Sequence, residues 1–100
     1  MDKTVMIDWK TVNNILSFEA QYNSKSDVFL MQSKEDRPAV SVDCDGEYWV
    51  RVDPETGEIL GIEIEDFKRI FLKRHPTLLK QKTTYVRPLA DLIQIERCSV

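Results

Sequence analysis

The sequence lacks a hydrophobic segment long enough to cross a membrane, because no apolar run approaches the ~20 residues of a spanning helix. The first five residues, Met-Asp-Lys-Thr-Val, also lack the basic start and apolar core of a secretory signal. We therefore expect a soluble, cytoplasmic protein with no membrane partner. The chain has 100 residues, of which 42% are hydrophobic and 31% charged. This size and composition predict a single globular domain over residues 1–100.

Cysteine and histidine are too scarce for a typical metal site. The chain has two cysteines, Cys44 and Cys98, in no CxxC pair, and one histidine, His75. A four-ligand zinc site would also need two carboxylates, which is unusual for a structural site. Cys44 shares the alternation of Val40 and Val42, which predicts a small buried residue. A disulfide between the two cysteines stays open, although a cytosolic setting argues against it. We expect no metal and no cofactor.

The acidic run Asp43, Asp45 and Glu47 resembles a calcium-binding loop only superficially. Such a loop needs a bidentate glutamate six residues after its glycine, and Val52 stands at that distance from Gly46. We interpret these acids as turn residues.

Two tight turns dominate the middle of the sequence. Asp45-Gly46 predicts a two-residue hairpin, because a type I′ turn needs positive φ at both central positions. The segment 53–58, Asp-Pro-Glu-Thr-Gly-Glu, predicts a second hairpin in which the glycine adopts a left-handed conformation. Strands are expected at 39–44, 48–52 and 59–64, with 28–32 as a fourth. The residues predicted to face inward are Tyr48, Val50, Val52, Leu60, Ile62 and Ile64.

Helices are expected on both sides of this meander. Apolar residues at spacings of three and four predict a helix from an N-cap at Asp8 to near Tyr22. A second helix should start at Glu65, bury a stripe of Phe67, Ile70 and Phe71, and end before Pro76. Pro88 to Glu96 is a candidate short helix. The predicted fold is α+β: a four-stranded antiparallel meander with an N-terminal helix, a helix following the last strand and a C-terminal extension.

No catalytic constellation stands out. His75 is the most tempting catalytic residue, but a helix C-terminus favours a cation for reasons unrelated to catalysis. We expect no enzymatic activity and name no catalytic residue.

One candidate interaction face consists of apolar residues that alternate with those expected inside. These residues are Phe29, Met31, Trp49 and Ile59. If the N-terminal helix leaves this face uncovered, it demands a partner or a second copy. The pattern favours a homo-oligomer, such as a homodimer, or a small protein partner.

The charge is divided between the two parts of the chain. Residues 1–66 carry a net charge of −9 and residues 67–100 a net charge of +6. The bases of a candidate basic patch are Lys68, Arg69, Lys73, Arg74, Lys80, Lys82 and Arg87. Such a segment suits phosphate contacts, so a nucleic-acid-binding regulator is the alternative function. The absence of a recognition motif and the net charge of −3 favour a protein-interaction module instead.

Two segments carry a family resemblance. Ser26-Asp27-Val28-Phe29-Leu30, followed by the run from Val50 through Asp-Pro-Glu-Thr-Gly to Gly61-Ile-Glu-Ile64, resembles domain of unknown function 2283 over about residues 26–75. That resemblance implies a small prokaryotic β-meander protein, sometimes encoded beside a small toxin-like partner, and hence an antitoxin-like role. It carries over no catalytic residue. The second turn also resembles peptidase-propeptide type domains, which are generally exported.

Overall fold

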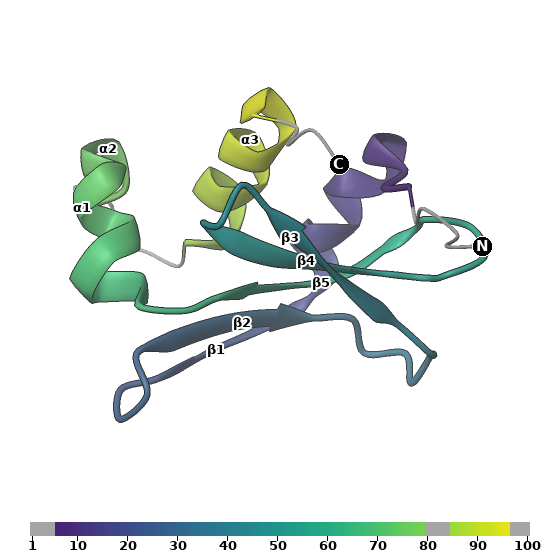
Figure 1. Cartoon of the computed structure of the whole chain (residues 1–100), viewed down its shortest axis with the longest axis horizontal. Helices are drawn as coiled ribbons and strands as arrows, with labels where there is room; N and C mark the ends of the chain where they lie inside the picture. Colours follow the sequence, from purple (N-terminus) through teal and green to yellow (C-terminus); the bar gives the residue numbers. More distant parts are fainter. Residues whose placement is uncertain (1–5, 80–84, 97–100) are drawn as a thin grey trace.

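Five antiparallel strands form one sheet in the order β1-β2-β5-β4-β3 in the computed structural model, which describes residues 6–79 and 85–96. In chain order the elements are η1 (Trp9–Ser17), β1 (Glu19–Asn23), β2 (Val28–Gln32), β3 (Val40–Cys44), β4 (Tyr48–Val52), β5 (Ile59–Ile64), η2 (Phe67–Phe71), α1 (Leu72–Arg74), α2 (Pro76–Leu79) and α3 (Val86–Glu96). Helices η1 and α3 lie together on one face of the sheet, and α1 and α2 lie at its end (Figure 1). The fold is α+β as predicted, with one strand more than expected.

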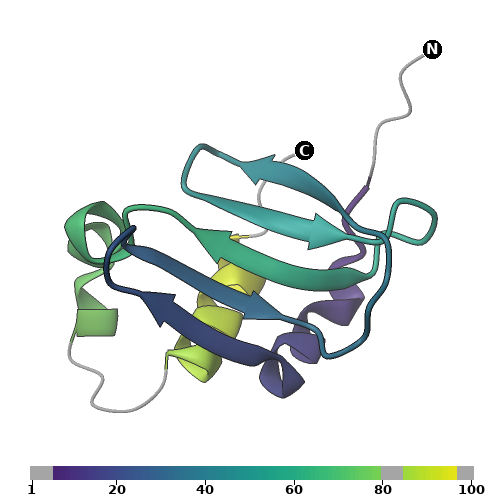
Figure 2. The same ribbon diagram turned by 90° about the horizontal axis from the view of Figure 1, so that it is seen from below.

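The core lies between the sheet and the two helices η1 and α3. Val12 and Ile15 of η1 and Leu89 and Ile93 of α3 are buried against it. The sheet contributes Phe29, Met31, Tyr48, Val50, Val52, Ile59, Ile62 and Ile64, all at most 6% exposed. Figure 2 views the sheet from its other face, which no helix of the described residues covers. The molecule is therefore a two-layer structure with one open sheet face.

The predicted N-terminal helix is too long, because its second half is a strand. η1 is a 3₁₀ helix capped by Asp8, whose carboxylate accepts a hydrogen bond from the Lys10 amide. It ends at Ser17, and residues 19–23 then pair with β2 as the edge strand β1. Glu, Ala and Gln favour a helix, but intrinsic propensity is small in free energy, and pairing with β2 outweighs it.

Strand β5 departs from the predicted alternation at its start. A β-bulge occurs here, because Arg51 pairs with Gly61 whereas the next residue, Val52, pairs with Ile59. Ile59 consequently enters the core and is fully buried. Leu60, which was predicted to face inward, lies instead beside the loop of residues 33–39.

The carboxylate of Asp27 holds the β1–β2 turn to the start of helix η2. It accepts hydrogen bonds from the backbone amides of Lys68 (2.9 Å) and Arg69 (3.0 Å) and from the Tyr22 hydroxyl (2.6 Å). The main-chain carbonyl of Asp27 accepts a further bond from the Phe67 amide. The helix's own N-cap residue, Asp66, makes no side-chain capping bond. Asp27 therefore caps this helix from a distant part of the chain.

These hydrogen bonds change the pKa values of the Asp27 carboxyl and the Tyr22 hydroxyl. Burial by itself raises the pKa of Asp27, but the hydrogen bonds from Tyr22, Lys68 and Arg69 and the Arg69 charge hold the pKa below its usual value. The hydrogen bond to Asp27 raises the pKa of the Tyr22 hydroxyl in turn. Asp27 is only 8% exposed, so the folded state keeps a buried, fully bonded carboxylate.

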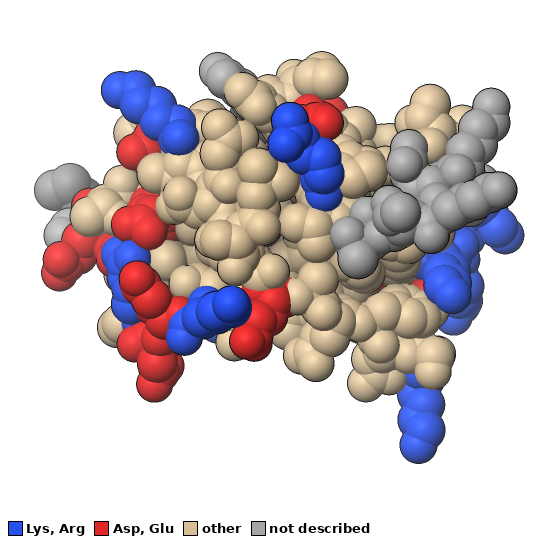
Figure 3. All heavy atoms as spheres, turned by 180° about the vertical axis from the view of Figure 1, so that it is seen from behind, with Lys and Arg blue, Asp and Glu red and all other residues tan. Residues whose placement is uncertain are grey.

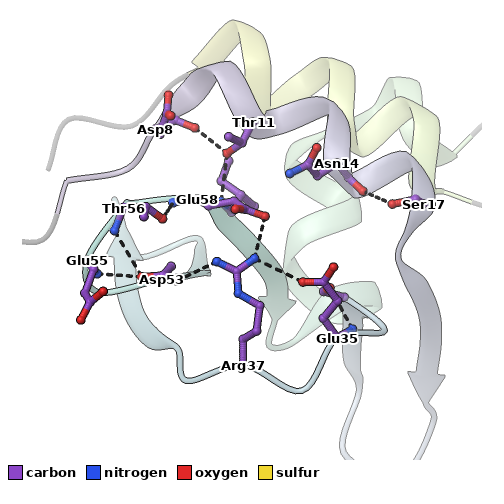
Figure 4. Close-up of polar contacts among 12 residues, drawn as sticks. Asp8, Thr11, Asn14, Ser17, Glu35, Arg37, Asp53, Glu55, Thr56 and Glu58 are labelled. Atoms are coloured by element: carbon purple, nitrogen blue, oxygen red, sulfur yellow. Dashed lines mark hydrogen bonds and ion pairs between the residues drawn. The ribbon is translucent and has the colours of Figure 1, made fainter.

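The N-terminal segment docks on the second hairpin turn through backbone groups. The Asp8 amide donates to the Gly57 carbonyl (2.8 Å). The Thr11 hydroxyl donates to the Asp8 carbonyl and accepts from the Ile59 amide (2.9 Å), as Figure 4 shows in part. Gly57 has a φ of +77°, and an added Cβ there would collide with the Met6 carbonyl oxygen. Only glycine therefore fits both the turn and the neighbouring segment.

Arg37 ties the loop of residues 33–39 to the same turn. Its guanidinium reaches Asp53 at 2.7 Å, Glu58 at 3.0 Å and Glu35 at 3.3 Å (Figure 4). The hydrogen bond from Arg37 holds the pKa of Asp53 below its usual value, and the Glu55 amide adds to this effect. This network lies at the opposite end of the sheet from η2 and fixes the long β2–β3 connection.

We predict that Asp27→Asn lowers the free energy of unfolding by about 2 kcal/mol at neutral pH, because one charged acceptor of the helix cap is lost. Asparagine tolerates the left-handed backbone of residue 27 (φ 57°), so backbone strain does not enter. A carboxyl with a depressed folded pKa stabilises above its unfolded value of about 3.9. The difference from wild type should therefore shrink as the pH falls below that value. Urea unfolding from pH 7 to pH 3 measures it, with the exposed Asp36→Asn as control; a pH-independent difference would contradict the assignment.

We predict that Gly57→Ala is more destabilising than Gly46→Ala. Both glycines have positive φ, so each substitution costs about 1–2 kcal/mol of backbone strain. Nothing lies within 4 Å of an added Cβ at Gly46, whereas Gly57 faces the Met6 carbonyl and the Asp8 amide. The clash should add at least about 1 kcal/mol for Gly57. Denaturant unfolding of the two variants compares them directly, and equal losses would show that the N-terminal segment moves aside.

Candidate functional site

A groove of about 300 Å³ lies between the β3–β4 hairpin and helix η2. Trp49 from β4 and Ile70 from η2 both line it, and they remain 37% and 41% exposed. The other lining residues are Asp43, Gly46, Glu47, Tyr48, Glu65, Asp66, Phe71 and Arg74. Large apolar side chains exposed within a concave surface are typical of a binding site.

Local structure explains why these two apolar side chains remain outside the core. Tyr48 and Val50 face inward, so Trp49 between them must lie on the open face of the sheet. On η2, Phe67 and Phe71 are buried, whereas Ile70 is exposed, contrary to the predicted apolar stripe. The hairpin turn has the predicted positive φ at Asp45 (56°) and Gly46 (73°).

The rim of the groove is strongly acidic. Four of its lining residues, Asp43, Glu47, Glu65 and Asp66, are acids, and Arg74 is the one base among them. One Asp66 oxygen lies 3.9 Å from Arg69, and Asp43 accepts a hydrogen bond from the Gly46 amide. A concave surface with this charge attracts cationic groups and repels phosphates.

A second cluster lies beside the groove and joins three separate elements. Glu47 comes from the β3–β4 turn, His75 follows α1, and Glu96 ends α3. His75 Nε2 lies 3.3 Å from Glu47 Oε1 and 4.0 Å from Glu96 Oε1. Burial and the neighbouring Glu47 charge raise the pKa of Glu96, while His75 opposes that rise. Sequence reasoning missed this cluster, because residues 47, 75 and 96 match no ligand spacing and meet only in the fold.

The Tyr48 hydroxyl is a buried polar group with no hydrogen-bond partner among the described residues. The side chain is 2% exposed, and its ring packs edge-on against Phe71. Burial raises the pKa of this hydroxyl, and the charges of Glu96, Glu47 and Asp45 raise it further. The hydroxyl therefore lies within the electrostatic field of the acidic cluster.

The predicted interaction face is not brought together. Phe29, Met31 and Ile59 are core residues under the helices, whereas Trp49 lies on the opposite face of the sheet. Phe29 pairs with Ile64 and Met31 with Ile62, so they share the inward face of their partners. The register between neighbouring strands decides which residues face the core, and alternation within one strand does not reveal that register.

The candidate basic patch is partly brought together. Lys68, Arg69, Lys73 and Arg74 are all exposed on η2 and α1. Lys and Arg side chains gather at that end of the molecule in Figure 3. Arg87 lies apart on α3, 3.6 Å from Asp91, and Lys80 and Lys82 lie outside the described residues.

Cys44 is fully buried as predicted, and it is disulfide-bonded, which the expected cytosolic setting argued against. The other cysteine, Cys98, lies outside the described residues. His75 follows the end of α1, as expected, and its side chain contacts Glu47, Glu96 and the Phe71 ring. None of these three contacting side chains is a serine, threonine or cysteine that His75 could activate as a nucleophile.

Comparison with known proteins identifies no relative of this chain. No family model matches the chain, and neither a curated protein nor a solved structure matches it significantly. The resemblance to domain of unknown function 2283 therefore stays a prediction. Within residues 6–79 and 85–96, no helix is long and apolar enough to cross a membrane.

We predict that Tyr48→Phe raises the free energy of unfolding by about 1 kcal/mol in metal-free buffer, because it removes a buried hydroxyl that has no hydrogen-bond partner among the described residues. Urea unfolding in the presence of a chelator measures the change. Tyr85→Phe, at a partly exposed tyrosine, is the control. A loss of stability for Tyr48→Phe would mean that the hydroxyl makes a hydrogen bond in solution.

Proposed function

We propose that this chain is a non-catalytic protein-interaction module whose groove binds a partner segment with a basic side chain beside an apolar one. The observation that carries this proposal is the pairing of exposed Trp49 and Ile70 with four carboxylates on the same rim. The apolar side chains suit an aliphatic or aromatic residue of the partner. The carboxylates suit a lysine or an arginine, which can also stack on the Trp49 ring.

The energetics favour a short segment rather than a broad interface. The groove is small, so one or two anchoring side chains must supply most of the binding free energy. Tryptophan is enriched among such anchors, and Trp49 stands where an acidic rim can select the partner by charge. A small basic protein partner, as in an antitoxin-like pair, fits these requirements. A second copy of the chain is a further outcome that the experiments below distinguish.

The alternative function is nucleic-acid binding through Lys68, Arg69, Lys73 and Arg74, which are exposed on consecutive turns of η2 and α1. The acidic groove beside them opposes this function, because its rim repels phosphates. Arg69 and Arg74 also lie close to these acids. We therefore rank this alternative second.

We predict that the wild-type protein selects basic and apolar peptides from a displayed library of random peptides. Trp49→Ala should weaken binding of the selected peptides by more than about tenfold, because it removes the central anchor. The double variant Glu65→Gln/Asp66→Asn should weaken basic peptides more at low salt than at high salt. Fluorescence anisotropy of labelled peptides measures both effects.

Lys73→Gln is the matched control, since this residue lies on the neighbouring helix but outside the groove. Selection of acidic peptides, or selection that Trp49→Ala leaves intact, would refute the groove as the binding site. Binding of random DNA or RNA that falls steeply with salt and is lost in Lys68→Gln/Arg69→Gln would favour the alternative function. Sedimentation of wild type and Trp49→Ala tests self-association through the same surface.

A further inference from the structure

The cluster of Glu47, His75 and Glu96 lies where three separate elements meet. It gathers two carboxylates and one imidazole from a hairpin turn and two helix ends. One ligand atom from each residue lies within 4.8 Å of the other two. The side chains are sheltered, with exposures of 19%, 15% and 27%.

We infer that this cluster is a binding site for a divalent transition-metal ion, with Glu47, His75 and Glu96 as its protein ligands. The site shares Glu47 with the rim of the groove, but the argument for a metal ion does not depend on what the groove binds.

The distances suit such an ion. Zinc binds imidazole nitrogen and carboxylate oxygen at about 2.0–2.2 Å, so neighbouring ligand atoms in a tetrahedron are about 3.3 Å apart. His75 Nε2 is 3.3 Å from Glu47 Oε1 and 4.0 Å from Glu96 Oε1. Small side-chain rotations therefore suffice to close the site around an ion. Glu96 ends α3, and its side chain is 27% exposed, which leaves room for such a rotation.

A second, independent observation points to a ligand at this place. The Tyr48 hydroxyl is buried without a hydrogen-bond partner among the described residues, and the Phe71 ring that Tyr48 contacts edge-on also packs against the His75 ring. A buried hydroxyl normally has a partner, and its absence needs an explanation. A metal-bound water molecule, or a carboxylate turned by the metal, would provide that partner.

The charges of the cluster favour a cation. Two carboxylates lie within 4.8 Å of one another around one imidazole nitrogen, and like charges at that distance repel. A protonated His75 offsets only one of these charges, whereas a dication offsets two. Mixed imidazole and carboxylate ligands favour zinc and its neighbours over calcium and magnesium, which prefer oxygen alone. Three protein ligands leave one tetrahedral position for water.

Isothermal titration of the untagged, full-length protein with zinc chloride in a non-reducing buffer tests the inference. We expect about one ion per chain with an affinity in the micromolar range or tighter, and no binding of calcium under the same conditions. Because the chain has a single histidine, the imidazole proton signals in NMR spectra report on His75 alone. The chemical shifts of those signals should change over the same range of zinc concentration as the heat of binding.

His75→Gln and Glu96→Gln should each weaken zinc binding by at least about tenfold. Tyr48→Phe should weaken it less. Glu55→Gln, at an exposed turn residue, is the matched control and should bind like wild type. The thermal unfolding midpoint without metal shows that each variant is folded, and zinc should raise it for wild type but not for His75→Gln.

Absence of saturable binding to the folded wild-type protein would overturn the inference. So would binding that leaves the His75 signals in place, or that Glu47→Gln and Glu96→Gln leave unchanged. In each of these three cases the cluster would be a histidine held between two glutamates.

Discussion

The buried carboxylate of Asp27 is the interaction on which this structure most depends. The helix that starts at Phe67 has no capping side chain of its own, and its first amides point toward the β1–β2 turn. Asp27 meets them there and fixes where the helix leaves the sheet. The start and direction of this helix set the positions of Ile70 and His75. The groove and the histidine cluster therefore both depend on the Asp27 carboxylate.

The two ends of the sheet are built in different ways. At one end, Arg37 and the backbone bonds around Gly57 lock the second hairpin turn to the N-terminal segment. At the other end, the first hairpin turn, α1 and α3 come together with acids, a histidine and a Tyr48 hydroxyl that has no partner among the described residues. The polar groups of the first end bond to one another, whereas the groove at the second end is lined by four acids and one base. Function is therefore best sought at the second end.

The sequence predicted what depends on local chemistry. The turns at Asp45-Gly46 and around Gly57, four strands, the Asp8 cap and the end of the helix before Pro76 all follow from short-range preferences, and the structure confirms them. What failed depends on contacts between distant segments: strand β1, the bulge that sends Ile59 inward, and the register that buries Phe29 and Met31. The predicted interaction face is not brought together for the same reason. Trp49 was recognised, but its neighbours across the groove come from another element, and the histidine cluster assembles only through the tertiary fold.

The strand order also has a kinetic consequence. The β1–β2 and β3–β4 pairs are hairpins that close over a few residues, and β5 extends the second of them. The β2–β5 pair, at the centre of the sheet, must instead close a loop over residues 33–58. Long loops form slowly because their closure costs chain entropy before any contact offsets it. We therefore expect the rate of folding to be set by the docking of one preformed hairpin on a preformed meander.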